Sequence, residues 1–324
     1  IIAVGALLLS FGLMGVISGY VVAPIIALAV SLYFVKKHKE TTEKSNVENR
    51  SSNSSFGISQ IFSFGFAFTL FNGLTIITMD LGLLMLKLLL RDNILAGYYT
   101  AAATIGKITF FLLGALPLTM LPSVSSSVAQ AKNKLTRKYI NYSIRYALLI
   151  LLPITILISI FSKQIITLLY PSEFIIAASA LQLLVFASTL FGLFLTLNSF
   201  IQAIHKPWHS FFISLFIGMI ALILTLTLIP KYGLFGAALA TTISALSGVI
   251  IAGFYVKRKF NTLFPLNSFM KIGAGSFMMY LVGTFIESTN IHFVISAILL
   301  VLLYLLTLVL FKELSKKDYD LFLA

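Results

Sequence analysis

Long apolar runs that carry no charged residue alternate along this chain with short polar segments. Because a helix needs about 20 residues to cross the hydrocarbon layer of a membrane, runs of this length are typical of transmembrane helices. The alternating pattern over about ten residues that marks a membrane barrel is absent from the sequence. The pattern therefore predicts an all-α protein with the end of one helix at residues 1–9 and nine full spans at 13–35, 59–85, 98–122, 143–162, 178–202, 209–230, 236–256, 268–287 and 292–311.

The composition excludes a soluble protein. Of the 324 residues, 59% are hydrophobic and only 10% are charged, and the mean hydropathy is +1.02. A soluble domain has about 25% charged residues, and its interior is too small to bury this much apolar surface. The chain has no cysteine, which excludes a disulfide scaffold and a cysteine-ligated metal site. We conclude that this is an integral membrane protein.

The formal net charge of +13 is distributed unevenly over the loops. If the segment 36–50 is cytoplasmic, 18 of the 23 basic residues lie on that side of the membrane and three lie on the other. This bias follows the positive-inside rule and predicts a multi-pass protein of the cell membrane with a cytoplasmic C-terminus. Topology and contact with anionic membrane lipids account for the charge, so no nucleic-acid partner is required.

Two segments of the chain are similar to each other. Residues 11–38 align without a gap with residues 232–259, at an offset of 221 residues, and two glycine pairs match, Gly12 with Gly233 and Gly15 with Gly236. Both segments run in the same direction across the membrane, which predicts two halves related by an axis along the membrane normal. The chain begins with Ile1 inside apolar sequence. We therefore expect the first half to start about 160 residues upstream of Ile1.

Five short motifs then occur in a fixed order. The run Leu95-Ala96-Gly97-Tyr98-Tyr99-Thr100-Ala101-Ala102 has the pattern GxYxxA, and it is followed by the segments 121–125, 166–173, 198–207 and 229–238. With these motifs the chain resembles the polysaccharide flippase branch of the multidrug/oligosaccharidyl-lipid/polysaccharide (MOP, MATE-like) superfamily. The resemblance implies a fourteen-helix transporter with two six-helix lobes and two additional C-terminal helices, which moves lipid-linked sugars outward.

The resemblance and the repeat together predict a domain organisation. Residues 1–35 would be the end of the N-terminal lobe, and residues 58–260 would be the C-terminal six-helix lobe. Residues 36–57 are polar and rich in Ser and Asn, which is typical of a flexible cytoplasmic linker. Residues 261–324 would hold the two additional helices and a cytoplasmic tail.

Ionisable residues inside the spans are the first candidates for a substrate site, because they are costly in the hydrocarbon layer. Lys107 lies about 13 Å into its span and would engage a substrate diphosphate as a point charge, unless it snorkels to the interface. Asp80 would bind a coupling cation (Na⁺ or H⁺) or pair across helices with Lys107, which lowers the cost of both. Lys87 is closer to a loop and is a weaker candidate, favoured as an interfacial residue.

Uncharged polar residues within the spans form a second group. Asn72, Asn198 and Gln202 would line the cavity or hydrogen-bond to neighbouring helices. The four-residue spacing of Asn198 and Gln202 places both on one helix face. Tyr98 and Tyr99 are predicted as belt aromatics at the membrane interface. We expect neither a metal site nor a bound cofactor, and we find no motif of a catalytic triad or a phosphate-binding loop.

Three functions fit these observations to different degrees. A transporter of a polyprenyl-diphosphate-linked oligosaccharide, working by alternating access, predicts a cationic cavity and is favoured by Lys107. A drug or cation exporter of the same superfamily would need carboxylates in the cavity, and only Asp80 qualifies. A membrane glycosyltransferase or polymerase would need a larger aqueous region than loops of about 20 residues provide. Enzymes of the same glycan pathway are the expected protein partners of a transporter, which is itself not expected to be an enzyme.

Overall fold

The computed structural model describes residues 18, 22–31, 33–34, 58–262, 266–287 and 293–313. The chain divides into two compact units, Ile1–Phe56 and Gly57–Ala324, which are described separately. In the first unit, Val22–Ser31 forms an apolar helix inside the span predicted at 13–35. The rest of that span, the predicted helix end at 1–9 and the polar segment 36–57 lie outside the described residues.

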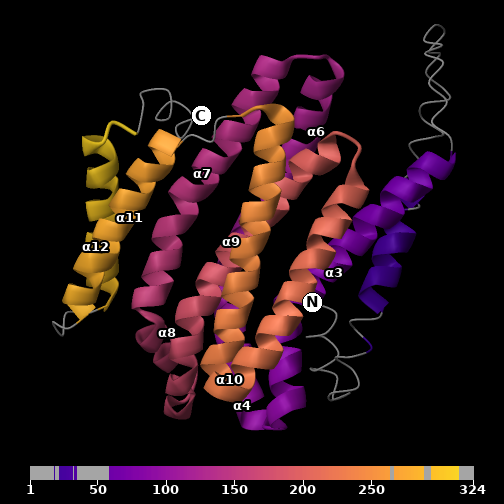
Figure 1. Cartoon of the computed structure of the whole chain (residues 1–324). Helices are drawn as coiled ribbons and strands as arrows, with labels where there is room; N and C mark the ends of the chain where they lie inside the picture. The colour runs from indigo at the N-terminus through magenta and orange to yellow at the C-terminus, as the bar shows by residue number, and fades with distance from the viewer. Residues whose placement is uncertain are drawn as a thin grey trace, which may run out of the picture. The chain divides into compact units, whose positions relative to one another are not determined.

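The second unit consists of helices over its described residues, joined by short turns (Figure 1). Its elements are α3 (Ile58–Leu90), α4 (Asn93–Gly106), α5 (Ile108–Leu113), α6 (Ala115–Ala129), α7 (Asn133–Ile160), α8 (Ser162–Leu169), the 3₁₀ helix η1 (Ser172–Ile176), α9 (Ala177–Ala203), α10 (Pro207–Phe260), α11 (Leu266–Glu287) and α12 (Phe293–Leu310).

Seven of these helical stretches are long and apolar enough to cross a membrane. The run of α4, α5 and α6 is one of them, and α10, with 54 residues, contains two of the predicted spans. Each of the eight spans predicted from residue 59 onward overlaps one of these helices, so the all-α membrane fold is confirmed. The largest difference is α7, which begins at Asn133 rather than at residue 143. Its first ten residues are polar but compatible with helix, so the helix continues beyond the apolar layer.

α10 contains a sharp break at Gly233, where φ is 54° and ψ is −127°. Side chains other than glycine are strained at such a positive φ. Gly236 lies against the chain before the break, and a Cβ atom there would collide with the carbonyl oxygen of Leu228. In a straight helix, residues eight positions apart are separated by about 12 Å, so α10 folds back on itself. In the second copy of the sequence repeat, the turn therefore requires both glycines, Gly233 and Gly236. Their counterparts in the first copy, Gly12 and Gly15, lie outside the described residues.

α9 lies in the middle of the second unit, between α7 and α10 (Figure 1). It also packs against α4, α5 and α6, and most of its residues are buried. Small residues allow the close approach: a Cβ atom on Gly192 would meet the side chain of Leu113 in α5, and a Cβ atom on Gly106 in α4 would meet the backbone of Leu184. Close packing of small residues is a main source of helix association in membranes, where lipid is as apolar as leucine.

Neutral hydroxyl pairs connect the helices inside this core. Thr155 of α7 and Thr189 of α9 have their hydroxyl oxygens 2.7 Å apart, and those of Thr75 in α3 and Ser214 in α10 are 3.0 Å apart. Such bonds contribute about 1 kcal/mol each in a membrane and need no charge. They fix the helices side by side without placing ions in the apolar layer.

A buried ion pair holds α11 and α12 to α7. Arg145 of α7 donates from Nε to Oε1 of Glu313 at 2.8 Å and from its guanidinium to the Glu313 carbonyl, while Nζ of Lys271 lies 3.5 Å from Oε2. The side chain of Glu313 is only 5% exposed. Tyr304 of α12 adds a hydrogen bond from its hydroxyl to the carbonyl oxygen of Leu149 at 2.9 Å. These contacts make the additional helices part of the packed unit.

Replacing either glycine of the α10 turn is expected to destabilise the protein. Gly233→Ala should lower the free energy of unfolding by about 1–3 kcal/mol because of the positive φ, and Gly236→Ala should do so by collision with Leu228. Gly273→Ala in α11 is the matched control, since no atom lies within 4 Å of its Cβ position. Thermal unfolding in detergent measures all three. Equal melting temperatures for the three variants would contradict the assigned turn.

Removing the acid of the buried ion pair is expected to loosen α12. Glu313→Gln removes the carboxylate charge that faces the buried Arg145 guanidinium and should cost about 3 kcal/mol. Lys271→Met is the control, because its ammonium is farther away and more exposed, and it should cost less than about 1 kcal/mol. Hydrogen exchange of the α12 amides measures the effect directly, and unchanged protection in Glu313→Gln would show that the pair does not hold α12.

Candidate functional site

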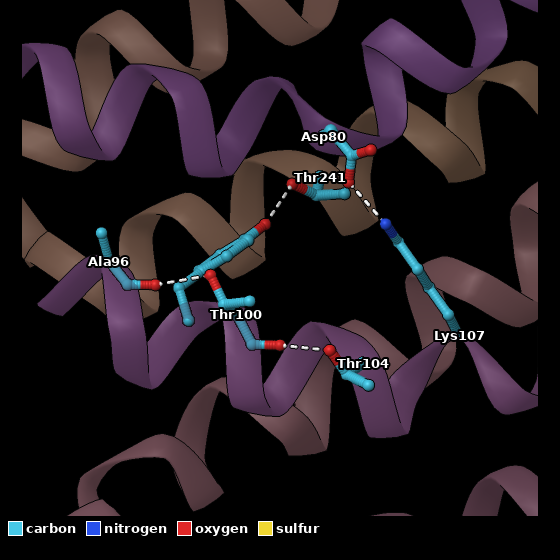
Figure 2. A network of polar contacts seen from close by, with 7 residues as sticks. Asp80, Ala96, Thr100, Thr104, Lys107 and Thr241 are labelled. Carbon is cyan, nitrogen blue, oxygen red and sulfur yellow. Dashed lines mark hydrogen bonds and ion pairs between the residues drawn. The ribbon is translucent and has the colours of Figure 1, made fainter. Parts of the chain in front are cut away.

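Asp80 and Lys107 form an ion pair within the membrane-spanning region. Nζ of Lys107 lies 2.6 Å from Oδ1 of Asp80, as Figure 2 shows. Asp80 belongs to α3, and Lys107 lies between α4 and α5, so the pair joins two spans. The cross-helix pair predicted from the sequence is present. Both side chains are only partly covered, with 29% of Lys107 and 37% of Asp80 exposed.

Lys107 occupies a break in its span. It ends α4 and precedes α5, and its backbone N–H donates to the carbonyl oxygen of Ala103. Asp92 starts α4 by accepting hydrogen bonds at Oδ1 from the backbone N–H groups of Ile94 and Leu95, which is ordinary N-capping. The 14 residues of α4 place Lys107 about 20 Å along the helix axis from that cap. A lysine stem is much shorter than this distance, which favours a position within the apolar layer over snorkelling to that end of the span.

A second polar contact lies beside the ion pair and joins three helices. The hydroxyl oxygens of Tyr99 in α4 and Thr241 in α10 are 3.1 Å apart. Thr241 itself donates to the carbonyl oxygen of Ala237, so Tyr99 is the donor of the pair. Gly82 of α3 leaves room for it, because a Cβ atom there would collide with the Tyr99 hydroxyl and lie 2.8 Å from Thr241 Oγ1. Gly82 lies two residues after Asp80 in α3, so this contact, drawn in Figure 2, fixes the helices that carry the pair.

Polar side chains continue along both helices from the ion pair. On α4, the exposed hydroxyls of Thr100 and Thr104 donate to the carbonyl oxygens four residues earlier, as Figure 2 shows. Those bonds leave the acceptor lone pairs of both hydroxyls available. On α3, the helical period places Thr69, Asn72 and Asp80 on one side. Ionisable groups are costly against lipid tails, so we expect the part of this surface around the ion pair to face water or protein.

The other predicted site residues are placed differently. Asn72 is partly exposed on the Asp80 side of α3, about 12 Å away along the axis, and its Nδ2 donates to the carbonyl oxygen of Phe68. Lys87 is exposed in the last turn of α3. Asn198 and Gln202 of α9 are 0% and 4% exposed and lie in the protein core. Asn198 Oδ1 and Gln202 Nε2 have no hydrogen-bond partner among the described residues. The structure thus brings Asp80 and Lys107 together, and it buries Asn198 and Gln202.

Sequence reasoning missed Gly82, Tyr99 and Thr241. The prediction of Tyr99 as a belt aromatic is wrong, because its side chain is only 1% exposed and is bonded to Thr241. The neighbouring Tyr98 is partly exposed and packs edge-on against Phe174, with ring centroids 5.0 Å apart. Two adjacent tyrosines at a span end have the same interface signal, and the signal that separates them is the GxYxxA pattern, whose Tyr position is Tyr99. For Gly82 and Thr241 the sequence contains no such signal.

A bundle of helices long and apolar enough to cross a membrane defines a multi-pass membrane protein. The family model described as "Lipid II flippase MurJ" matches residues 1–317 of this chain. The chain belongs to that family. The flippase resemblance inferred from the motifs is therefore confirmed.

Individual relatives agree with this assignment. The chain is 27% identical over 160 residues to "Probable low-salt glycan biosynthesis flippase Agl15" of Haloferax volcanii, a match covering 49% of this chain and 34% of that protein. It is 29% identical over 151 residues to "Lipid II flippase MurJ" of Bacillus subtilis, covering 45% and 28%. The matches thus span about a third of the length of these curated relatives.

A solved structure shares the fold. It is titled "Lipid II flippase MurJ, inward closed conformation" and superposes with a TM-score of 0.70 at 19% sequence identity. The superposition covers 96% of this chain and 65% of that one. At this identity the likeness shows the fold alone. The all-α flippase fold is nevertheless the same one that the sequence motifs implied.

The contact beside the ion pair is expected to contribute to stability. Tyr99→Phe removes one buried hydrogen bond and should cost about 1 kcal/mol, while Gly82→Ala forces the Tyr99 hydroxyl away from Thr241 and should cost about 1–3 kcal/mol. Gly65→Ala, also in α3, has no atom within 4 Å of its Cβ position and is the matched control. Thermal unfolding measures the series. A Gly82→Ala variant as stable as Gly65→Ala would contradict the assigned packing.

Proposed function

We propose that the protein translocates a polyprenyl-diphosphate-linked oligosaccharide from the inner to the outer leaflet of the cell membrane. Membership of a flippase family supports this proposal, because the names of both curated relatives describe flippases. The observation that carries it is the ammonium of Lys107, which lies within the apolar layer on a partly exposed polar surface. A lysine persists there where it faces a cavity or a partner.

Lys107 would engage the diphosphate of the substrate. The ammonium is a compact point charge with three donors, which suits phosphate oxygens approaching from several directions. The exposed hydroxyls of Thr100 and Thr104, and the amide of Asn72, would accept hydrogen bonds from sugar hydroxyls on the same surface. A charged contact supported by neutral acceptors fits an anionic head group with an uncharged glycan.

Transport would follow alternating access between two lobes. In this proposal, residues 58–260 form the C-terminal lobe, residues 1–35 belong to the other lobe and residues 36–57 link them on the cytoplasmic side. The last two helices are α11 and α12, and the C-terminus would be cytoplasmic. The basic residues at the start of α7 and the end of α10 support this orientation through the positive-inside rule.

The structure gives less support to export of cationic compounds. Such an exporter needs a carboxylate that is available to a cation inside the apolar layer. Among the described residues, Asp80 is the carboxylate at that depth, and its Oδ1 is bonded to Lys107. The flippase proposal also makes the protein a transporter rather than an enzyme, with enzymes of glycan assembly as its expected partners.

Removal of the Lys107 ammonium is expected to abolish most transport. Vesicles containing the intact protein and an NBD-labelled polyprenyl-diphosphate oligosaccharide report flipping as the fraction of label that dithionite reduces. Lys107→Ala should flip at least about tenfold more slowly than wild type, the order expected for one lost charged hydrogen bond. Lys163→Ala, an exposed lysine at the start of α8, is the matched control and should flip normally. A folded Lys107→Ala variant with wild-type flipping would contradict the proposal.

A further inference from the structure

The protein contains two ion pairs of very different construction. Arg145 and Glu313 are 13% and 5% exposed, and the glutamate accepts from both a guanidinium and a second cation, Lys271. Asp80 and Lys107 are 37% and 29% exposed and share one contact, between Nζ and Oδ1. The first pair is sealed and multiply bonded. The second is open to a ligand and held by one bond.

The open pair is also incomplete on the acidic side. Among the described residues, Oδ2 of Asp80 has no hydrogen-bond partner, and the nearby Tyr99 hydroxyl donates to Thr241 instead. The buried carboxylate of Glu313, in contrast, has a cationic partner at each oxygen. The packing between α3, α4 and α10 is already supplied by the Tyr99–Thr241 contact and by the space at Gly82.

The basic side of the pair lies at the junction of two helices. Lys107 lies between α4 and α5, and it extends across to α3 from this break (Figure 2). A lysine side chain has four rotatable bonds, so its ammonium can move by several ångströms at little cost.

We propose that Asp80 is an internal competitor that holds the ammonium of Lys107 while the site is empty and is displaced by the substrate's diphosphate. This inference rests on the proposed function. The carboxylate occupies the position that a phosphate oxygen would take, so the empty site remains neutral in the apolar layer. Without it, Lys107 would be an uncompensated cation whenever the substrate is absent, which is costly at this depth.

The exchange is favourable for a diphosphate and not for weaker anions. A diphosphate carries more charge than one carboxylate and offers several acceptor oxygens to the three donors of an ammonium. Because the pair is partly exposed, solvent screens it and its net strength is modest. Anions with a single charge gain too little from Lys107 to replace an aspartate that is already in place. An anion must therefore interact more strongly with Lys107 than Asp80 does in order to bind, which favours diphosphates over monovalent anions.

The first test compares binding of a diphosphate probe to variants of the intact protein. Farnesyl diphosphate is titrated against the protein in lipid nanodiscs, at fixed salt and without divalent cations. Asp80→Asn removes the competitor and should bind the probe about tenfold more tightly than wild type, the effect expected for one charged contact. Asp80→Glu retains the carboxylate and should bind nearly as wild type does. Glu173→Gln, an exposed acid removed elsewhere, is the charge-matched control.

The variants with a changed lysine separate this inference from the proposed function. Lys107→Ala should lose most of the affinity, and Asp80→Asn combined with Lys107→Ala should bind as weakly as Lys107→Ala alone. If Lys107→Ala binds and flips normally, the proposed function fails. If Lys107→Ala loses binding but Asp80→Asn binds no more tightly than wild type, only the competition fails. Weaker binding of the probe by Asp80→Asn than by wild type would also overturn the proposed competition, because Asp80 would then assist ligand binding.

A measurement on the wild-type protein avoids dependence on the folding of Asp80→Asn. Dicyclohexylcarbodiimide modifies carboxyl groups within membranes, and peptide mass spectrometry locates the product. Farnesyl diphosphate should increase the rate of modification at Asp80, because displacement from Lys107 frees the carboxyl group, while a monovalent anion such as chloride at the same ionic strength should not. Protection of Asp80 by the diphosphate, or an unchanged rate, would contradict displacement.

Discussion

In an apolar layer, an ammonium group is stable only when a counter-charge or water is within reach. Lys107 meets this constraint through Asp80 at 2.6 Å and through its partial exposure. Much of the surrounding structure follows from it. α3 supplies the acid, the break between α4 and α5 supplies the base, and the contact of Tyr99 with Thr241 adds α10 to the same region. Three spans converge where the two charges meet.

Away from the ends of the spans, the remaining described side-chain contacts between spans are made by neutral groups. Hydroxyl pairs such as Thr155–Thr189 and Thr75–Ser214, and small residues such as Gly192, hold the helices together in the core. The one deeply buried ion pair among the described residues, Arg145–Glu313, lies at the end of α12, where the chain leaves the apolar layer. Away from the ends of the spans, packing among the described residues is thus carried by neutral groups. An ion pair that packing does not need, in the interior of the spans, calls for another role.

The spans and the ion pair could both be predicted from the sequence because charged residues are rare in the apolar runs. So few charges occur in the apolar runs that Asp80 and Lys107 have few other partners, and consecutive spans are antiparallel neighbours. Sequence reasoning did not find which side of a helix is buried. Asn198 and Gln202 share a face by spacing, but that spacing is the same for a cavity surface and for a core. Tyr98 and Tyr99 differ by one residue and therefore by about 100° of helix rotation, which reverses their environments.

Affinity and turnover place opposite demands on a charged transport site. A free ammonium would bind a diphosphate tightly, but it would be costly to carry through the membrane once the substrate had left. A sealed pair of the Arg145–Glu313 kind would remain neutral and bind nothing, because several contacts would have to break at once. A half-exposed pair with one bond lies between these limits. It compensates the lysine in the empty state and can still be opened by a ligand that offers more negative charge than one carboxylate.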